Sequence, residues 1–299
     1  MTTQRKALTD LLEPAFLARL DALDWISRRV LRGKMQGERR SKARGQGVEF
    51  ADHRPYAVGD DLRFVDWNIY ARLNQLVLKL FLEEQDLTVH IAMDLSGSMA
   101  TGDPSKARYV KRLAAALGYL SLVHNNRVTL SGFAEGLQGQ LGPMRGRAYL
   151  ASMAEFLLAR PEQGESRFDA SCRQLAASRT GSGIMVVLSD FFIKEGFETG
   201  LRRLVSPHHD LYVIQVLSPQ ELAPTLSGDL RLIDVEDGDA AEVTLSGALL
   251  KYYHRTLAAY CNQVKDFCVR HGAVYALADS SGSVEGLVLN TLRRMRLLK

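Results

Sequence analysis

The residues best suited to chemistry are the run DLSGSM at residues 94–99. Its Asp-x-Ser-x-Ser pattern places the carboxylate of Asp94 and the hydroxyls of Ser96 and Ser98 in one short turn. Hard oxygen donors of this kind suit Mg²⁺, Mn²⁺ or Ca²⁺ rather than zinc. Asp and Ser are also common helix N-caps, so a capped turn without a metal is the alternative interpretation.

Two further residues strengthen the case for a cation site. Asp190 ends the apolar run VVLSD as Asp94 ends the run TVHIAMD. If these runs are neighbouring strands, both carboxylates point into one crevice, because ligands gather at the carboxyl ends of strands where the strand order reverses. Ser166, in the segment GESRFDA before a predicted helix, offers a third hydroxyl. The sequence therefore predicts a divalent-cation site built by Asp94, Ser96, Ser98, Ser166 and Asp190.

From residue 88 onward, the elements that must position these residues alternate between strands and helices. Strand patterns occupy residues 88–94, 127–134, 183–190, 210–217 and 273–279. Helical patterns occupy residues 104–123, 146–159, 169–179, 196–205, 247–271 and 284–297. Such alternation predicts an α/β fold with a doubly wound, mainly parallel sheet flanked by helices. The stretch 218–246 breaks the rhythm and predicts an inserted β-hairpin.

The N-terminal region is organised differently. Apolar residues recur at helical spacing over residues 13–32 and predict an amphipathic helix. Four glycines in segment 33–50 indicate a loop, and alternating leucines over residues 76–82 indicate a strand. We therefore expect an N-terminal helix, loop and docking segment over residues 1–87, followed by the α/β domain over residues 88–299.

Composition limits the class of protein. The chain has 299 residues, of which 46% are hydrophobic and 24% charged, so it can bury a large core without disulfides. Its three cysteines show no paired pattern and indicate reduced thiols. The first residues have no signal-peptide pattern, and no apolar run is long enough to span a bilayer. We expect a cytoplasmic location and no membrane span.

Positive charge is concentrated in one segment. Eight basic residues and one acid, Glu38, lie between Arg28 and Arg44, although the net charge of the chain is only +4. Such a segment could meet nucleic acid, anionic lipid or an acidic protein. It lacks the interleaved aromatic residues typical of nucleic-acid binding. We expect it to be solvated and keep nucleic-acid association through residues 28–44 as an alternative.

The sequence gives little support for catalysis. Asp103 and Pro104 stand where a phosphate-binding loop needs Lys and Ser or Thr, so nucleotide binding is not expected. Ser96 lies on a predicted strand-to-helix turn but lacks the flanking glycines of a hydrolase nucleophile. None of the seven histidines falls in the three site loops. We expect a non-enzymatic protein and keep a metal-dependent hydrolase at the same site as the alternative.

The five predicted ligands resemble a known site. Position by position, they match the metal-ion-dependent adhesion site of von Willebrand factor A domains. The sequence departs from that pattern in two places. Ser166 stands where these sites usually have Thr, which offers the same hydroxyl. Phe191 and Phe192 follow Asp190 where many A domains place Gly, which concerns the shape of the loop more than the carboxylate.

A longer stretch upstream is more specific. The segment GQGVEFADHRPYAVGDDLRFVDWNIYAR (45–72), followed by FLEEQDLTVHIAMDLSGSM, is similar to the bacterial family called domain of unknown function 58. Members of that family carry an A-type domain, and the resemblance covers roughly residues 37 to 295. We expect segment 45–87 to dock onto the A-type domain instead of folding alone.

The resemblance implies a mechanism for binding a partner protein. The serines would bind a divalent cation directly, with Mg²⁺ the first choice, and the aspartates would act directly or through water. One coordination position would stay open for a Glu or Asp from a partner protein. Because family members are often encoded beside MoxR-type AAA+ ATPases, such an ATPase or its client is the expected partner. This function rests on analogy between folds.

Overall fold

The computed structural model describes residues 8–27, 49–82, 87–225 and 228–298. The chain forms two compact units, one combining residues 1–32 with 87–299 and the other comprising residues 33–86. This division differs from the expected N-terminal segment 1–87, because the residues before position 33 group with the α/β unit. The basic segment 28–44 lies outside the described residues.

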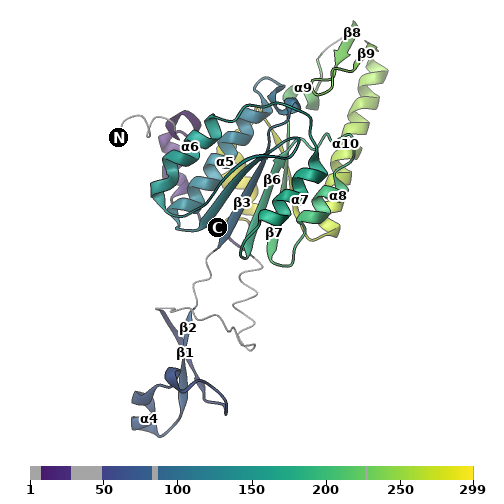
Figure 1. Ribbon diagram of the computed structural model, residues 1–299. Helices are drawn as coiled ribbons and strands as arrows, with labels where there is room; N and C mark the ends of the chain where they lie inside the picture. Colours follow the sequence, from purple (N-terminus) through teal and green to yellow (C-terminus); the bar gives the residue numbers. More distant parts are fainter. Residues whose placement is uncertain (1–7, 28–48, 83–86, 226–227, 299) are drawn as a thin grey trace. The chain divides into compact units, whose positions relative to one another are not determined.

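A six-stranded sheet forms the centre of the α/β unit (Figure 1). In spatial order its strands are β10 (Val274–Asp279), β7 (His209–Leu217), β6 (Gly183–Ser189), β3 (Thr88–Asp94), β4 (Arg127–Phe133) and β5 (Leu137–Met144). Every neighbouring pair is parallel except β4 and β5, which are antiparallel. The structure confirms the predicted α/β fold, and it places β3 beside β6, the condition on which the shared site depends.

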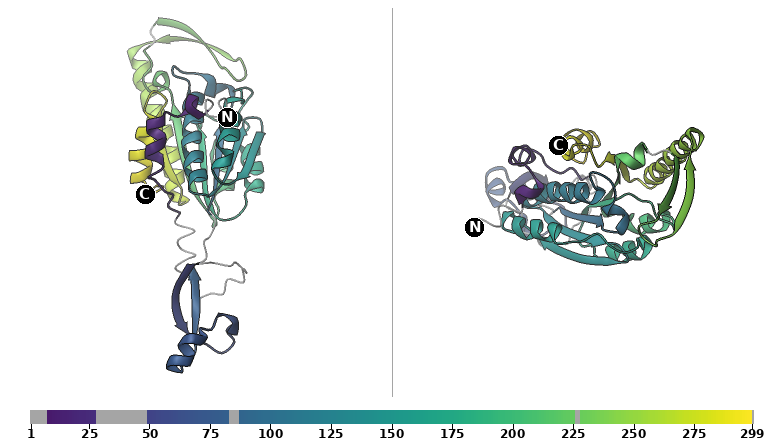
Figure 2. Two further views of the ribbon diagram at one scale, coloured as in Figure 1. Left: turned by 90° about the vertical axis from the view of Figure 1, so that its left-hand side faces the viewer. Right: turned by 90° about the horizontal axis from the view of Figure 1, so that it is seen from above.

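Helices cover both faces of the sheet (Figure 2), so every residue of the central strands β3 and β6 is buried. Along β3, Val89, Ile91 and Met93 belong to one core cluster, whereas Ala92 belongs to the other. The first cluster includes residues of α2 (Pro14–Leu20), α5 (Lys106–Val123), α6 (Leu150–Leu158), α11 (Val284–Gly286) and the π-helix η4 (Leu287–Leu292). The second includes residues of α7 (Phe168–Ser178), α8 (Glu198–Leu204) and α10 (Gly247–Arg270).

The helix predicted over residues 13–32 is wrong in its length. Helix α2 ends at Leu20, and the chain then follows a non-helical path to the end of the described segment at residue 27. On this path Trp25 forms a β-bridge with Leu298, and its indole nitrogen donates to the Ser121 hydroxyl at 3.0 Å. Pairing with the distant C-terminus therefore replaces the local helical pattern.

The predicted insertion contains the expected hairpin. Strands β8 (Gly228–Ile233) and β9 (Ala240–Leu245) pair in antiparallel register, and the short helix α9 (Pro219–Leu222) precedes them. No helix in the described part of the chain combines the length and apolar character that crossing a bilayer requires.

The second unit contains a separate two-stranded sheet. Strand β1 (Glu49–Pro55) pairs antiparallel with β2 (Val77–Leu82), and the single-turn helix η1 (Leu62–Phe64) and helix α4 (Trp67–Leu73) lie between them in the chain. Asp66 caps α4 by accepting the backbone N–H groups of Asn68 and Ile69, and it also pairs with Lys79 of β2 at 3.3 Å. The docking of segment 45–87 onto the A-type domain stays a prediction.

Candidate functional site

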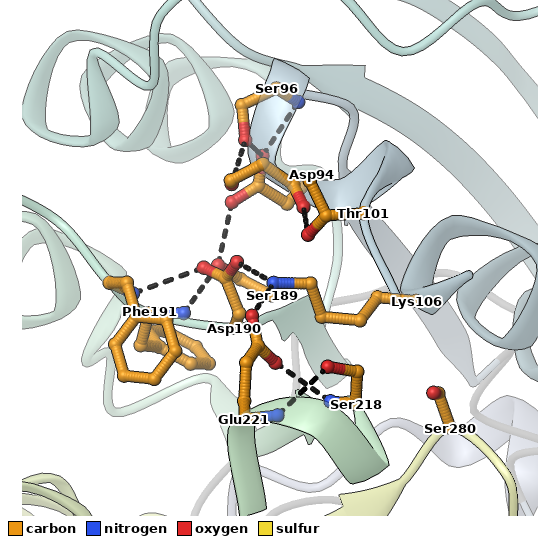
Figure 3. Close-up of polar contacts among 12 residues, drawn as sticks. Asp94, Ser96, Thr101, Lys106, Ser189, Asp190, Phe191, Ser218, Glu221 and Ser280 are labelled. Carbon is orange, nitrogen blue, oxygen red and sulfur yellow. Dashed lines mark hydrogen bonds and ion pairs between the residues drawn. The ribbon is translucent and has the colours of Figure 1, made fainter. Parts of the chain in front are cut away.

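The candidate site lies where the strand order of the large sheet reverses. Numbered along the chain, the six strands stand in the order 6-5-4-1-2-3, so the first strand, β3, is beside the fourth, β6. Open α/β sheets bind ligands at this switch point, at the carboxyl ends of the strands. Asp94 is the last residue of β3 and Asp190 directly follows β6, so the topology brings both to this point (Figure 3).

The Asp94 carboxylate is buried, with 1% of the residue exposed. Its Oδ1 accepts the backbone N–H of Ser96 at 3.0 Å and the Ser96 hydroxyl at 2.7 Å, while Oδ2 accepts the Ser189 hydroxyl at 2.6 Å. Burial, followed by the negative charge of Asp190, raises the pKa of Asp94 to about 7, and the hydrogen bonds from both serines oppose this rise. A cation would offset both unfavourable effects.

The two serines of the Asp-x-Ser-x-Ser turn converge beside Asp94. A tight turn, η2 (Gly97–Ala100), follows Ser96 and brings the Ser98 hydroxyl within 3.1 Å of the Ser96 hydroxyl. Ser96 is buried, whereas Ser98 is partly exposed. The turn therefore presents two hydroxyl oxygens and one carboxylate together, as its spacing indicated.

The loop that carries Ser166 is held against this turn by the backbone. The N–H of Gly97 donates to the carbonyl of Gly164, and the N–H of Gln163 donates to the carbonyl of Leu95, both at 2.9 Å. The Ser166 hydroxyl oxygen is buried and has no hydrogen-bond partner among the described residues. Ser166 thus lies in the adjoining loop with a free hydroxyl, but it makes no hydrogen bond to the other four predicted ligands.

Asp190 already has a positive partner inside the protein. Its Oδ2 accepts the Lys106 ammonium group at 2.6 Å, and its Oδ1 accepts the backbone N–H of Phe192 at 3.0 Å. Lys106, only 1% exposed, also pairs with Glu221 of α9 (Figure 3). Burial alone would lower the pKa of Lys106, but the two carboxylates outweigh burial and raise it.

In the turn after Asp190, Phe191 occupies the position where many A domains have glycine. Phe191 has a φ of 59°, in the left-handed region that glycine adopts most easily. Its N–H donates to the Ser189 hydroxyl at 2.9 Å, and its buried ring packs edge-on against Phe168. Core packing of the ring therefore stabilises a backbone conformation that is strained for a residue with a side chain.

Comparison with known proteins places the chain in a family. The sequence profile of the family described as "Protein of unknown function DUF58" matches residues 52–262. The chain belongs to the DUF58 family. Its curated relatives include uncharacterised proteins of Mycobacterium tuberculosis and Mycobacterium bovis, each 27% identical over 257 residues, which cover 84% of this chain and 80% of the relative.

Solved structures similar to this DUF58 chain are more distant. The conserved hypothetical protein BatB from Bacteroides thetaiotaomicron is 17% identical, with a TM-score of 0.44 over 70% of this chain and 98% of BatB. The SpRpn10 VWA domain is 13% identical, with a TM-score of 0.38 over 69% of this chain and 94% of that domain. The fold class of this DUF58 chain rests on its own strand order.

The donor set fits a hard divalent cation. The described partners of Asp94 are two serines, so its charge is not neutralised by a basic group, and Ser166 has a spare hydroxyl oxygen. Carboxylate and hydroxyl oxygens are the ligands that Mg²⁺ and Ca²⁺ prefer. Within the described ranges, no group of three or more His, Cys, Asp or Glu residues is placed to hold a metal. The five-residue cation site stays a prediction.

Sequence reasoning missed three residues of this site. Ser189, Lys106 and Glu221 complete the hydrogen-bonded network around the two aspartates. Ser189 directly precedes the predicted ligand Asp190, so its position in the sequence indicated a place near the site. Glu221 belongs to a capping box with Ser218, and the spacing in SPQE indicates such a box. The burial of Lys106 had no local signal, because Asp190 lies 84 positions away in the sequence.

Proposed function

We propose that this protein is a non-enzymatic adaptor that binds a partner protein through a divalent cation, Mg²⁺ by preference. Asp94, Ser96, Ser98, Ser166 and Asp190 would hold the ion. The observation that carries the proposal is the buried Asp94 carboxylate, which lies beside a second carboxylate at the switch point. Its partners among the described residues are hydroxyl and N–H groups. When bound, the cation would supply a positive charge that a partner's carboxylate completes.

The two aspartates would take different roles. Asp94 presents its charge next to the hydroxyls of Ser96 and Ser98, so it suits direct binding of the ion. Both oxygens of Asp190 already accept hydrogen bonds, from Lys106 and from the backbone of Phe192. We infer that Asp190 contributes charge through water, while Lys106 and Phe192 hold its carboxylate in one orientation.

The proposed partner contributes an acidic side chain. The family resemblance makes a MoxR-type AAA+ ATPase or its client the first candidate, and the cytoplasmic location expected from the sequence stays a prediction. A metal-dependent hydrolase at the same site would instead turn over a substrate in a metal-dependent reaction. We propose binding without turnover, because no histidine lies in the three site loops and the hydroxyls of Ser96 and Ser98 suit the role of cation ligands.

A pull-down from the native cell lysate tests this function. Tagged wild type, Asp94→Ala and the control Asp103→Ala are compared in Mg²⁺ and in EDTA, and captured proteins are identified by mass spectrometry. Asp103 is an exposed acid in the loop after η2 and makes backbone contacts with Gln220, so its carboxylate is dispensable. We expect a partner captured by wild type and Asp103→Ala only in Mg²⁺. Capture by Asp94→Ala in EDTA would contradict the proposal.

A further inference from the structure

The turn of the inserted hairpin lies beside the proposed cation site. This turn, residues 234–239, joins β8 to β9 and reads DVEDGD. A Cβ atom at Gly97 of η2 would lie 3.6 Å from the carbonyl oxygen of Val235 and equally far from that of Gly164. The hairpin turn, the Asp-x-Ser-x-Ser turn and the Ser166 loop therefore meet around Gly97.

Ion pairs fix the hairpin turn to the loop that follows Asp190. Lys194 of that loop pairs with Asp234 at 2.8 Å and also with Asp237. Within the turn, the N–H of Glu236 donates to Asp234 Oδ1 at 2.8 Å. These contacts leave the Glu236 side chain between the two anchored acids, facing the Ser166 loop.

Glu236 reaches the proposed ligand Ser166 directly. Its Oε2 accepts the backbone N–H of Ser166 at 3.1 Å. Its other carboxylate oxygen, Oε1, is buried and has no hydrogen-bond partner among the described residues, and the same holds for the Ser166 hydroxyl. A buried polar atom without a partner carries a free-energy cost, which is larger when the atom is charged. A cation coordinated by both oxygens would remove that cost at both atoms.

From these contacts we infer that Glu236 is an internal ligand of the cation. It takes the coordination position that the proposed function gives to the partner's carboxylate, and the inference rests on that function. The β8–β9 hairpin thereby closes the site in the free protein. A partner's Asp or Glu binds by displacing Glu236.

The surroundings allow this displacement. A cavity of about 360 Å³ adjoins Glu236 and is lined by Ser166, Phe192 and Lys194 among others. The Lys194 side chain is 58% exposed, and exposed ion pairs contribute little to stability. The hairpin turn can therefore leave the site without breaking the core, and the cavity offers space for an incoming side chain.

Calorimetric titration of Mg²⁺ into the full chain tests the inference. We expect Glu236→Gln to weaken Mg²⁺ binding about tenfold relative to wild type, because it removes a charged ligand. Glu242→Gln, an exposed change on β9 of the same hairpin, should stay within about twofold of wild type, the scatter normal for a surface site. Equal affinities of wild type and Glu236→Gln would overturn the inference.

Chemical rescue separates ligation from a structural effect of the hairpin. Glu236→Ala opens space where a free carboxylate can bind, so excess sodium acetate should restore its Mg²⁺ affinity, while sodium chloride at equal ionic strength should not. Wild type should gain nothing from acetate. Absence of rescue would contradict a ligand role.

The same titrations distinguish failure of the inference from failure of the proposed function. If Asp94→Ala abolishes Mg²⁺ binding while both Glu236 variants match wild type, the cation site stands and Glu236 is not its ligand. If wild type itself binds no Mg²⁺, the proposed function and the inference both fail.

Discussion

At the scale of single residues, the buried carboxylate of Asp94 lowers the stability of the metal-free protein. Its carboxylate is buried near Asp190, and its partners in the described part of the chain are hydroxyls and one N–H. Lys106 pairs with the other aspartate, whereas no basic side chain among the described residues pairs with Asp94. This asymmetry explains why one of two neighbouring carboxylates suits direct cation binding.

The raised pKa of Asp94 predicts a pH dependence of stability. Since the folded pKa, about 7, lies above that of an unfolded aspartate, the folded protein holds a proton that the unfolded chain releases above roughly pH 4. The contribution of Asp94 to the free energy of unfolding therefore falls as pH rises from about 4 to 7. Asp94→Asn should remove this fall, so its stability advantage over wild type should grow to on the order of 4 kcal/mol by pH 7. Urea denaturation of the two metal-free proteins at several pH values measures their free energies of unfolding. If these free energies changed with pH in the same way, the prediction would be refuted.

Lys106 should be essential for stability through its carboxylate partners. Lys106→Met leaves buried Asp190 without its positive partner, which should lower the free energy of unfolding by about 3–5 kcal/mol. Adding Asp190→Asn removes the unpaired charge, so the double variant should recover part of the loss. Urea denaturation of the two single variants and the double variant gives the coupling energy. If the loss of stability in the double variant equalled the sum of the two single losses, the Lys106–Asp190 ion pair would not stabilise the protein.

At the scale of elements, the site depends on the close pairing of β3 and β6. A Cβ atom at Gly183 of β6 would lie 2.0 Å from the Thr88 carbonyl oxygen of β3. Gly183→Ala should therefore force these strands apart and destabilise the protein by about 3 kcal/mol. Gly247→Ala, at the start of α10 where a new Cβ would meet no atom within 4 Å, is the matched control and should be neutral. An unchanged free energy of unfolding for Gly183→Ala in urea denaturation would mean that β3 and β6 can move apart without loss of stability.

The buried parallel strands were predictable because their patterns are local. The apolar runs ending at Asp94 and Asp190 identified β3 and β6, and with them the two carboxylates at the switch point. Strand β5 was missed, because Gly139, Gly142 and Pro143 interrupt its apolar residues and resemble a loop. Its strand structure comes from antiparallel pairing with β4, which no local pattern encodes.

The rest of the site depends on contacts between distant segments. The burial of Lys106 requires both Asp190 and Glu221. The approach of Glu236 to Ser166 requires the inserted hairpin to lie over the site, although the hairpin itself was predicted. Sequence spacing identified candidate ligands, but tertiary packing decides which of them already have partners.

At the scale of the whole molecule, the α/β unit is completed by the start of the chain. Leu12, Phe16 and Leu20 belong to its large core cluster, although residues 33–86 of the other unit intervene before β3. The unit is therefore discontinuous in sequence. This arrangement was not foreseen, because local patterns do not show which distant surface covers a helix.

Two deletions test this organisation. Replacing residues 33–86 by a flexible Gly/Ser linker should leave a cooperative urea transition, because few core residues are lost from the α/β unit. Deleting residues 1–27 should instead destabilise the unit by several kcal/mol, since each buried large apolar side chain contributes about 1.5–3 kcal/mol. Equal stability of the second deletion and the full chain would refute the discontinuous unit.

The thermal melt of the full chain with and without Mg²⁺ tests cation binding at Asp94 most directly. A ligand that binds only the folded state stabilises it, by about 2.7 kcal/mol at one hundred times its Kd. We predict that millimolar Mg²⁺ raises the Tm of wild type and of Asp103→Ala above their values in EDTA, and leaves that of Asp94→Ala unchanged. An equal Mg²⁺ effect on all three proteins, or no effect on wild type, would contradict a cation site built on Asp94.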